Sequence, residues 1–217
     1  SPVPTTHRLL EYVPLALRYD GSLKDSKGLT TFGVGVSGDS WFSGSTPKLQ
    51  GITASSRSTG HWIAFTPSLG RDLSFHTNWV LSLHADGQVA SEPLIANEQF
   101  GLGGLAGVRG YHEGEVFGDD GWRITTEQKT PYYVVGTVYG NHPLTVRGSI
   151  FMDYGEAYLL DPGDRKGRTQ LWGVGFGGVA SIGANWEARF LFSWPLLSAG
   201  LTEAGQPRFD FGLSAQF

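Results

Sequence analysis

The sequence contains no cysteine, which excludes disulfide bonds and thiolate metal sites. It has no excess of positive charge: the formal net charge is -4, and the dispersed lysines and arginines do not form the basic surface of a nucleic-acid-binding protein. It also lacks a continuous apolar run for a membrane helix, because five glycines interrupt the best candidate, residues 169–186. No residues have metal-ligand spacing, and no serine lies in a Gly-x-Ser-x-Gly motif. We therefore expect no catalytic residue, metal or cofactor.

Glycine and aromatic residues are plentiful, with 32 glycines and 13% aromatic residues. This combination is typical of β-barrels, where glycines relieve curvature and aromatic side chains form girdles at the membrane interfaces. Apolar side chains recur at every second position through about nine segments of roughly ten residues, the length of a tilted transmembrane strand. The predicted strands are residues 9–20, 29–38, 61–70, 75–88, 122–130, 144–158, 171–181, 186–197 and 208–217.

The two faces of these predicted strands differ sharply. One face is almost wholly Phe, Trp, Leu, Val and Ile, whereas the other carries charges on nearly every strand. We expect the charged face to line a water-filled lumen, because charged side chains at membrane depth seek a polar cavity. The predicted inward charges are Arg18, Arg123, Lys129, Arg147, Glu187 and Arg189. A soluble antiparallel sheet or sandwich also alternates, but it would bury its apolar face and need a second layer.

The connections between these strands alternate in length. Residues 21–27, 70–74 and 183–185 read as short turns, whereas residues 39–59 and a later glycine-rich stretch read as long loops. Long loops at one end and short turns at the other are the pattern of outer-membrane barrels. The connection at residues 133–141 is longer than that pattern predicts. Asp119 and Asp120 could suggest a cation site, but a solvated acidic loop tip is the favoured interpretation.

The long glycine-rich loop covers about residues 89–121 and carries Arg109 near its centre. Loops of this length inside a compact fold are usually functional. We expect it to fold back into the lumen, with Arg109 paired to Asp153 and with Glu127 nearby, because strand periodicity points both carboxylates inward. In a wet lumen such a pair contributes only about 1 kcal/mol, or somewhat more if it is partly desolvated. Residues 101–106 also fit the dinucleotide pattern G-x-G-x-x-A, but the required strand and helix context is missing.

Two motifs stand out in this pattern: Val108, Arg109, Gly110 and Tyr111 in the loop, and Phe151, Asp153 and Gly155 on a later strand. With these motifs the sequence resembles the two-partner-secretion transporters, the TpsB family, in the superfamily that also includes the assembly protein BamA. The resemblance covers residues 61–217 well and the first sixty residues only by pattern. The final alternating strand, with Phe209, Phe211 and the terminal Phe217, looks like the assembly signal that the barrel-assembly machinery reads.

The resemblance implies an all-β fold: residues 1–217 would be the C-terminal part of a larger, sixteen-stranded antiparallel barrel in the outer membrane of a Gram-negative bacterium. Periplasmic POTRA domains would lie outside this chain. The implied function is a translocation pore that secretes a partner protein without nucleotide, and its other partners would be the lipid bilayer and the barrel-assembly machinery. A BamA-like insertase and a barrel that anchors a passenger enzyme remain alternatives.

Overall fold

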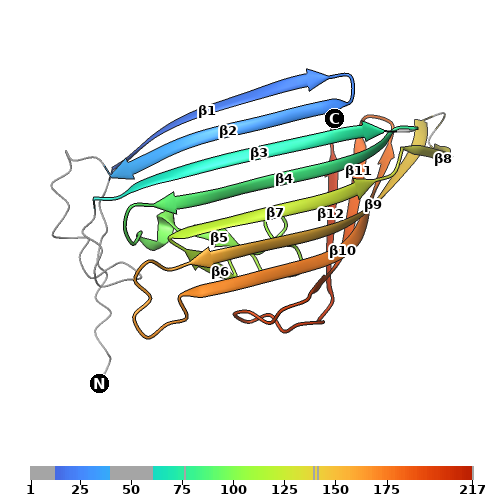
Figure 1. Cartoon of the computed structure of the whole chain (residues 1–217). Coiled ribbons are helices and arrows are strands. Elements are labelled where there is room, and N and C mark those ends of the chain that lie inside the picture. The colour runs from blue at the N-terminus through green and yellow to red at the C-terminus, as the bar shows by residue number, and fades with distance from the viewer. Residues whose placement is uncertain (1–12, 40–60, 76, 139, 141, 217) are drawn as a thin grey trace.

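The computed structural model describes residues 13–39, 61–75, 77–138, 140 and 142–216. It confirms an all-β antiparallel fold, dominated by one curved sheet (Figure 1). Within the described residues, no helix is long and apolar enough to cross a membrane. Nine strands follow one another across the sheet: β1 Pro14–Asp25, β2 Gly28–Asp39, β3 Ile63–Phe75, β4 Trp79–Ala90, β7 Asp120–Lys129, β9 His142–Tyr158, β10 Arg168–Ile182, β11 Trp186–Pro195 and β12 Arg208–Ala215.

The sheet is open, since β1 and β12 form its two edges and do not pair with each other. Three short elements lie between β4 and β7: the 3-10 helix η1 Ala96–Glu98 and the strands β5 Phe100–Leu102 and β6 Val116–Gly118, which pair as a separate hairpin. The long loop is therefore not structureless. The described chain forms a partial barrel wall with a folded loop on its concave side.

Two predicted turns are wrong. Residues 21–25 belong to β1, which pairs with β2 as far as Asp25 and Gly28, so only residues 26 and 27 turn. Residues 70–74 belong to β3, and the turn lies at residues 76–78, of which residue 76 is outside the described part. Polar residues at these strand ends resemble a turn locally, but backbone pairing with the neighbouring strand extends each ladder.

Strand β8, Tyr133–Val138, explains the connection that seemed too long. It pairs with the beginning of β9, while β7 pairs with the remainder of the same edge of β9. β7 and β8 therefore continue each other along one strand, interrupted near Pro131, which has no N–H group to donate to a ladder. The connection after β8 is short, because β9 begins at His142, and the wall is nine strands wide.

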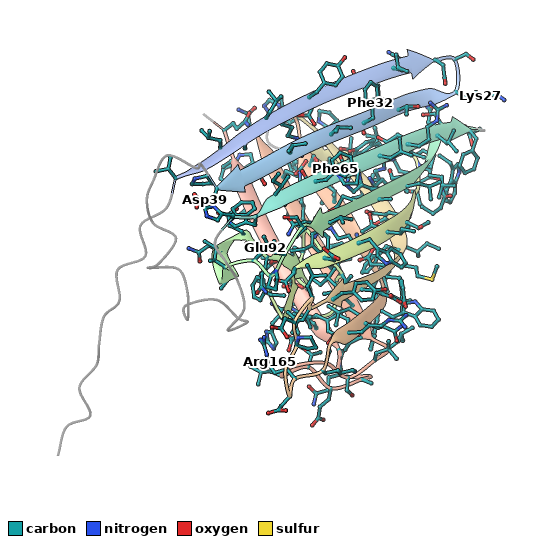
Figure 2. All side chains as sticks on the ribbon, turned by 60° about the vertical axis from the view of Figure 1, so that its left-hand side comes forward. Lys27, Phe32, Asp39, Phe65, Glu92 and Arg165 are labelled. Atoms are coloured by element: carbon teal, nitrogen blue, oxygen red, sulfur yellow. The ribbon has the colours of Figure 1, made fainter. Side chains whose placement is uncertain are left out.

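Alternate connections lie at opposite ends of the sheet because all neighbouring strands are antiparallel. Figure 2 places Asp39, Glu92 and Arg165 at the end with the long connections and Lys27 at the other end. The short connections are residues 26–27, 76–78, 139–141 and 183–185. The predicted loop at residues 39–59 lies outside the described residues except for Asp39, which ends β2.

The convex face of the sheet is apolar and exposed, as the alternation predicts. Its exposed residues include Leu17, Val36, Ile63, Phe65, Leu69, Ile150, Phe176, Phe190, Phe209 and Phe211. The opposite face carries ion pairs between neighbouring residues and strands, such as Arg18 with Asp20 and Arg123 with Asp86, each at 2.8 Å. Two charged pairs depart from the pattern and lie on the convex face: Arg71 with Asp25 at 2.8 Å near the short-turn end, and Arg168 with Glu156 at 2.6 Å near the other end.

Candidate functional site

The candidate site is the place where the long loop, residues 91–119, meets the inner wall of β7, β9 and β10. The hairpin of β5 and β6 contacts β9 and brings the loop across the concave face (Figure 1). A small apolar core forms between the loop and the wall, from Leu102, Val108 and Tyr111 on one side and Ala157 and Leu171 on the other. This buried cluster therefore lies inside the wall, where the loop packs.

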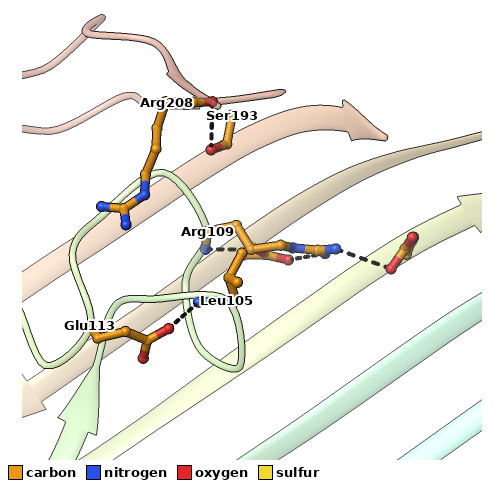
Figure 3. A network of polar contacts seen from close by, with 7 residues as sticks. Leu105, Arg109, Glu113, Ser193 and Arg208 are labelled. Atoms are coloured by element: carbon orange, nitrogen blue, oxygen red, sulfur yellow. Dashed lines mark hydrogen bonds and ion pairs between the residues drawn. The ribbon is translucent and has the colours of Figure 1, made fainter. Parts of the chain in front are cut away.

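Arg109 lies at the tip of the loop and contacts two strands. Its Nε lies 2.7 Å from Asp153 Oδ2 and its Nη2 lies 2.7 Å from Asp153 Oδ1, so the carboxylate is held bidentately (Figure 3). Its Nη1 lies 3.1 Å from Glu127 Oε2. The backbone N–H of Arg109 also donates to Asp153, at 3.0 Å. The structure thus brings together the three charged residues that the sequence singles out.

The surroundings of this cluster are drier than the sequence suggested. The Asp153 side chain is 0% exposed and that of Arg109 is 12% exposed. The Arg109 guanidinium also lies 3.6 Å from the centre of the Phe151 ring, which adds a cation–π contact. Burial lowers the pKa of Arg109, but the hydrogen bonds and charges of Asp153 and Glu127 outweigh it and raise that pKa. Loop packing removes water from Asp153, so the desolvated form of the pair, and not the fully solvated one, describes this cluster.

Tyr111 fixes the loop through the backbone of the wall. Its ring is fully buried, and its hydroxyl lies 2.7 Å from the carbonyl oxygen of Leu197 and 3.1 Å from that of Trp172. The N–H groups of the same two residues point to this hydroxyl, at 3.2 Å from Trp172 and 3.3 Å from Leu197. Burial is the main reason that the pKa of Tyr111 is raised. The hydroxyl thus joins β10 to the segment after β11.

The glycines of the two motifs allow a close approach of loop and wall. Gly110 has a φ of +100°, and a β-carbon there would lie 3.0 Å from the backbone nitrogen of Pro195. A β-carbon on Gly155 would lie 2.8 Å from the Leu102 side chain. Both positions need a residue without a side chain, one for its backbone conformation and both for space.

Glu115 links the long loop to the connection between β11 and β12, a contact that the sequence did not reveal. Its carboxylate accepts hydrogen bonds from the Thr202 hydroxyl at 2.7 Å, from the Thr202 N–H at 3.2 Å, from the Leu201 N–H, and from the His112 N–H at 3.1 Å. Burial alone would raise the pKa of Glu115. The hydrogen bonds from these donors lower it by more, so the net shift of this pKa is downward.

Two further contacts surround this link. Arg208 Nη1 lies 2.9 Å from His112 Nδ1, so the beginning of β12 also reaches the loop. Glu113 accepts a hydrogen bond from the N–H of Leu105 at 2.7 Å, which closes the loop on itself (Figure 3). The loop is therefore attached to β7, β9, β10 and both sides of the β11–β12 connection.

Asp119 is not at a solvated loop tip, and that interpretation is wrong. It is 1% exposed, and its carboxylate accepts hydrogen bonds from the N–H of Leu94, the amide of Gln99 and the N–H of Leu160, at 2.8 to 2.9 Å. Asp120 belongs to β7 and accepts from the N–H of Ala90 at 2.7 Å. Both carboxylates hold the base of the loop, and no group of three potential ligands for a metal occurs among the described residues.

The predicted C-terminal signal is only partly described. Phe209 and Phe211 lie on β12, with exposures of 55% and 64% on the convex face. Phe217 lies outside the described residues.

Comparison with known proteins places this wall and loop in a family. The family model of haemolysin secretion/activation proteins ShlB/FhaC/HecB matches residues 11–179. No curated protein sequence matches the chain. Among solved structures, CdiB from Escherichia coli is similar, with a TM-score of 0.74 and 16% sequence identity. The match covers 94% of this chain and 36% of the CdiB chain, so this chain spans about a third of that protein.

Proposed function

Because the chain belongs to the ShlB/FhaC/HecB family of haemolysin secretion/activation proteins, we propose that it forms part of an outer-membrane pore that secretes a partner protein. The open edges of the sheet and the 36% coverage of the CdiB chain support a larger barrel, of which these residues form one side. The apolar convex face suits lipid, and the polar concave face suits a water-filled path.

The docked loop carries this proposal. A lumen that holds a folded loop is obstructed, so passage of a polypeptide requires that the loop move. The Arg109 cluster suits this requirement. The arginine fork holds the loop in one docked geometry, but it attaches the loop to the wall through hydrogen bonds and charge alone, which can break. We infer that Val108, Arg109, Gly110 and Tyr111 define the closed position, with Asp153 and Glu127 as the receptors on the wall.

The proposed pore uses no nucleotide and performs no catalysis. Phe151, Asp153 and Gly155 would serve only to receive the loop: the ring lies under the guanidinium, the carboxylate binds it, and the glycine leaves space for Leu102. We also propose that Phe209 and Phe211 take part in insertion by the barrel-assembly machinery, since both project from an edge strand into the position of lipid.

Two measurements on the full-length protein test the pore. Proteins in the culture medium are compared between cells with and without the gene, and we expect at least one protein to disappear when the gene is removed. In planar bilayers, deletion of residues 103–117 should raise the conductance of the purified protein, because it removes the loop. A folded protein that exports nothing and conducts no ions in either form would contradict the pore. Lower levels of other outer-membrane proteins in the cells without the gene would instead indicate an insertase.

A further inference from the structure

A cavity of about 550 Å³ lies beside the Arg109 cluster, on the side of the short turns. The loop contributes Leu105 and Arg109 to its lining, and the wall contributes the rest from β7, β9, β10, β11 and β12. Tyr132 adds an aromatic ring. The cavity is enclosed partly by the loop and partly by the curvature of the sheet, so its residues face the proposed path of the secreted chain.

Backbone register arranges the lining residues of the wall in rows across the strands. Glu127 lies opposite Phe151, in the row next to Asp153. The following row contains Lys129, Ser149, Gly177, Leu191 and Asp210. The row after that contains Arg147, Val179, Arg189 and Gly212. Successive rows on one face are two residues apart, which is about 6.6 Å along a strand.

The charges in these rows are not balanced. Arg189 pairs with Glu187 at 2.5 Å, and Asp210 pairs with Arg208 at 3.3 Å. Lys129 instead contacts the Ser82 hydroxyl at 3.2 Å, and Arg147 donates to the Thr130 carbonyl at 2.9 Å. Of the described carboxylates, none lies within ion-pair distance of either Lys129 or Arg147. Glu127 acts on Lys129 from beyond ion-pair distance, but its carboxylate is held by Arg109. Lys129 and Arg147 therefore leave positive charge in a partly enclosed cavity, where it attracts an anion.

Glycine makes the cavity hollow. Gly177 and Gly212 occupy inward positions at which other residues would project a side chain into it. No described atom lies within 4 Å of a β-carbon built on Gly212. A larger residue at Gly212 would therefore fill the cavity without a clash at its β-carbon, which makes this position a probe of occupancy.

We propose that this cavity binds an extended segment of the secreted chain that carries carboxylates at alternate positions, with Lys129 and Arg147 as the binding residues. An extended peptide places side chains i and i+2 on one face about 6.6 Å apart. Lys129 and Arg147 are diagonal neighbours on β7 and β9, a relation that spans roughly 7–8 Å, so two such side chains can reach both cations. The proposal rests on the proposed pore for the identity of the ligand, whereas the binding site rests on the cavity and its charges.

The test measures binding directly, in full-length protein in detergent micelles. A fluorescein-labelled nonapeptide of alternating serine and glutamate is compared with the same peptide carrying glutamine in place of glutamate. Fluorescence anisotropy should show tighter binding of the glutamate peptide, and added salt should weaken it. Two exposed ion pairs predict a loss of roughly tenfold in affinity for the variant Lys129→Gln with Arg147→Gln.

Two further variants make the result specific. Gly212→Leu should reduce binding of both peptides by filling the cavity. Lys27→Gln with Lys166→Gln removes the same number of charges outside the cavity and should leave binding unchanged. Heat-modifiable migration in SDS gels verifies that each variant is folded. Equal affinity for both peptides overturns the site. A loss of affinity in the Lys27 and Lys166 control variant as large as that in the Lys129 and Arg147 variant also overturns it. If the protein exports a partner but binds both peptides equally, the peptide-binding site is overturned and the proposed pore stands. If it binds the glutamate peptide specifically but exports nothing, the binding site stands and the proposed pore is overturned.

Discussion

The carbonyl oxygen of Arg109 lies 1.9 Å from the position that a β-carbon of residue 173 would occupy, so Gly173 is the place where the loop tip touches β10. No rotation of a side chain can relieve this approach, because the carbonyl belongs to the backbone and the position of a β-carbon is fixed by the backbone. The tip of the loop and the wall therefore fit together only with glycine at this position.

Gly173→Ala should displace the loop tip while leaving the barrel assembled. We expect a cost of roughly 1–3 kcal/mol for docking of the loop, the range for overpacking a close-packed contact. Trypsin cleavage after Arg109 reports the displacement, because the Arg109 side chain is only 12% exposed in the docked loop. Gly212→Ala is the matched control on the same wall, since no described atom lies near its β-carbon. Equal cleavage of the two variants would contradict the close fit.

Arg109→Lys should weaken the closed position of the loop without abolishing barrel assembly. Lysine keeps the positive charge but loses the planar fork that holds both oxygens of Asp153. The expected loss is about 1–2 kcal/mol in loop docking, less than the roughly 3–5 kcal/mol for leaving a buried carboxylate unpaired. Conductance of the full-length protein should rise, and its heat-modifiable migration should stay unchanged. Arg168→Lys on the convex face provides the control, and identical conductance in both variants would remove the fork from the mechanism.

Tyr111→Phe should loosen the segment after β11. The change removes the hydroxyl that the N–H and C=O groups of Trp172 and Leu197 contact. Leaving buried polar groups unpaired costs about 1–3 kcal/mol. Hydrogen exchange of the Leu197 amide should become faster, whereas amides in the centre of β3 should not change. Tyr19→Phe, at an exposed position on the convex face, is the matched control. Unchanged exchange at Leu197 would show that the ring alone attaches the loop.

The link at Glu115 should open in acid. Its pKa is lowered in the docked loop, so its contribution is complete above the ordinary glutamate pKa of about 4.3 and is lost as the pH falls through the lowered value. Spin labels at Phe117→Cys and Glu203→Cys, in a chain that has no other cysteine, should keep their distance at neutral pH and separate in acid, as the pH falls below the ordinary glutamate pKa.

Glu115→Gln provides the control for that titration. The amide keeps the shape of the carboxylate and accepts fewer and weaker hydrogen bonds, so the two labels should be further apart already at neutral pH. Charge-assisted hydrogen bonds on a half-buried group suggest a loss of about 1–2 kcal/mol. If the variant keeps the parent distance at neutral pH and separates in acid as the parent chain does, another group causes the acid transition.

Sequence periodicity predicted the wall well because each strand imposes a period of two on its side chains. This rule alone predicts that Asp153 and Glu127 lie on the inner face. In the structure both carboxylates contact Arg109 of the loop. It did not fix the strand ends, since β1 and β3 continue through polar residues that read locally as turns. Strand extension depends on the backbone of a neighbour, which the local sequence does not contain.

The loop could be predicted less well because it has no period. Glu115 contacts residues 86 and 87 positions away, and nothing in the local sequence marks these partners. Asp119 lies between glycine and aspartate, a composition typical of exposed turns, yet three donors from separate segments surround it. The burial of Asp153 likewise depends on how the loop packs, so its strength could not be estimated from strand periodicity.

The Tyr111 hydroxyl contacts only main-chain atoms of Trp172 and Leu197. Every amino acid except proline presents the same N–H and C=O groups at those positions, so the attachment does not depend on which side chains they carry. Trp172 projects its ring to the convex face, where 39% of its surface is exposed. The convex surface can therefore change through substitution at position 172, while the loop inside the wall keeps the same anchor.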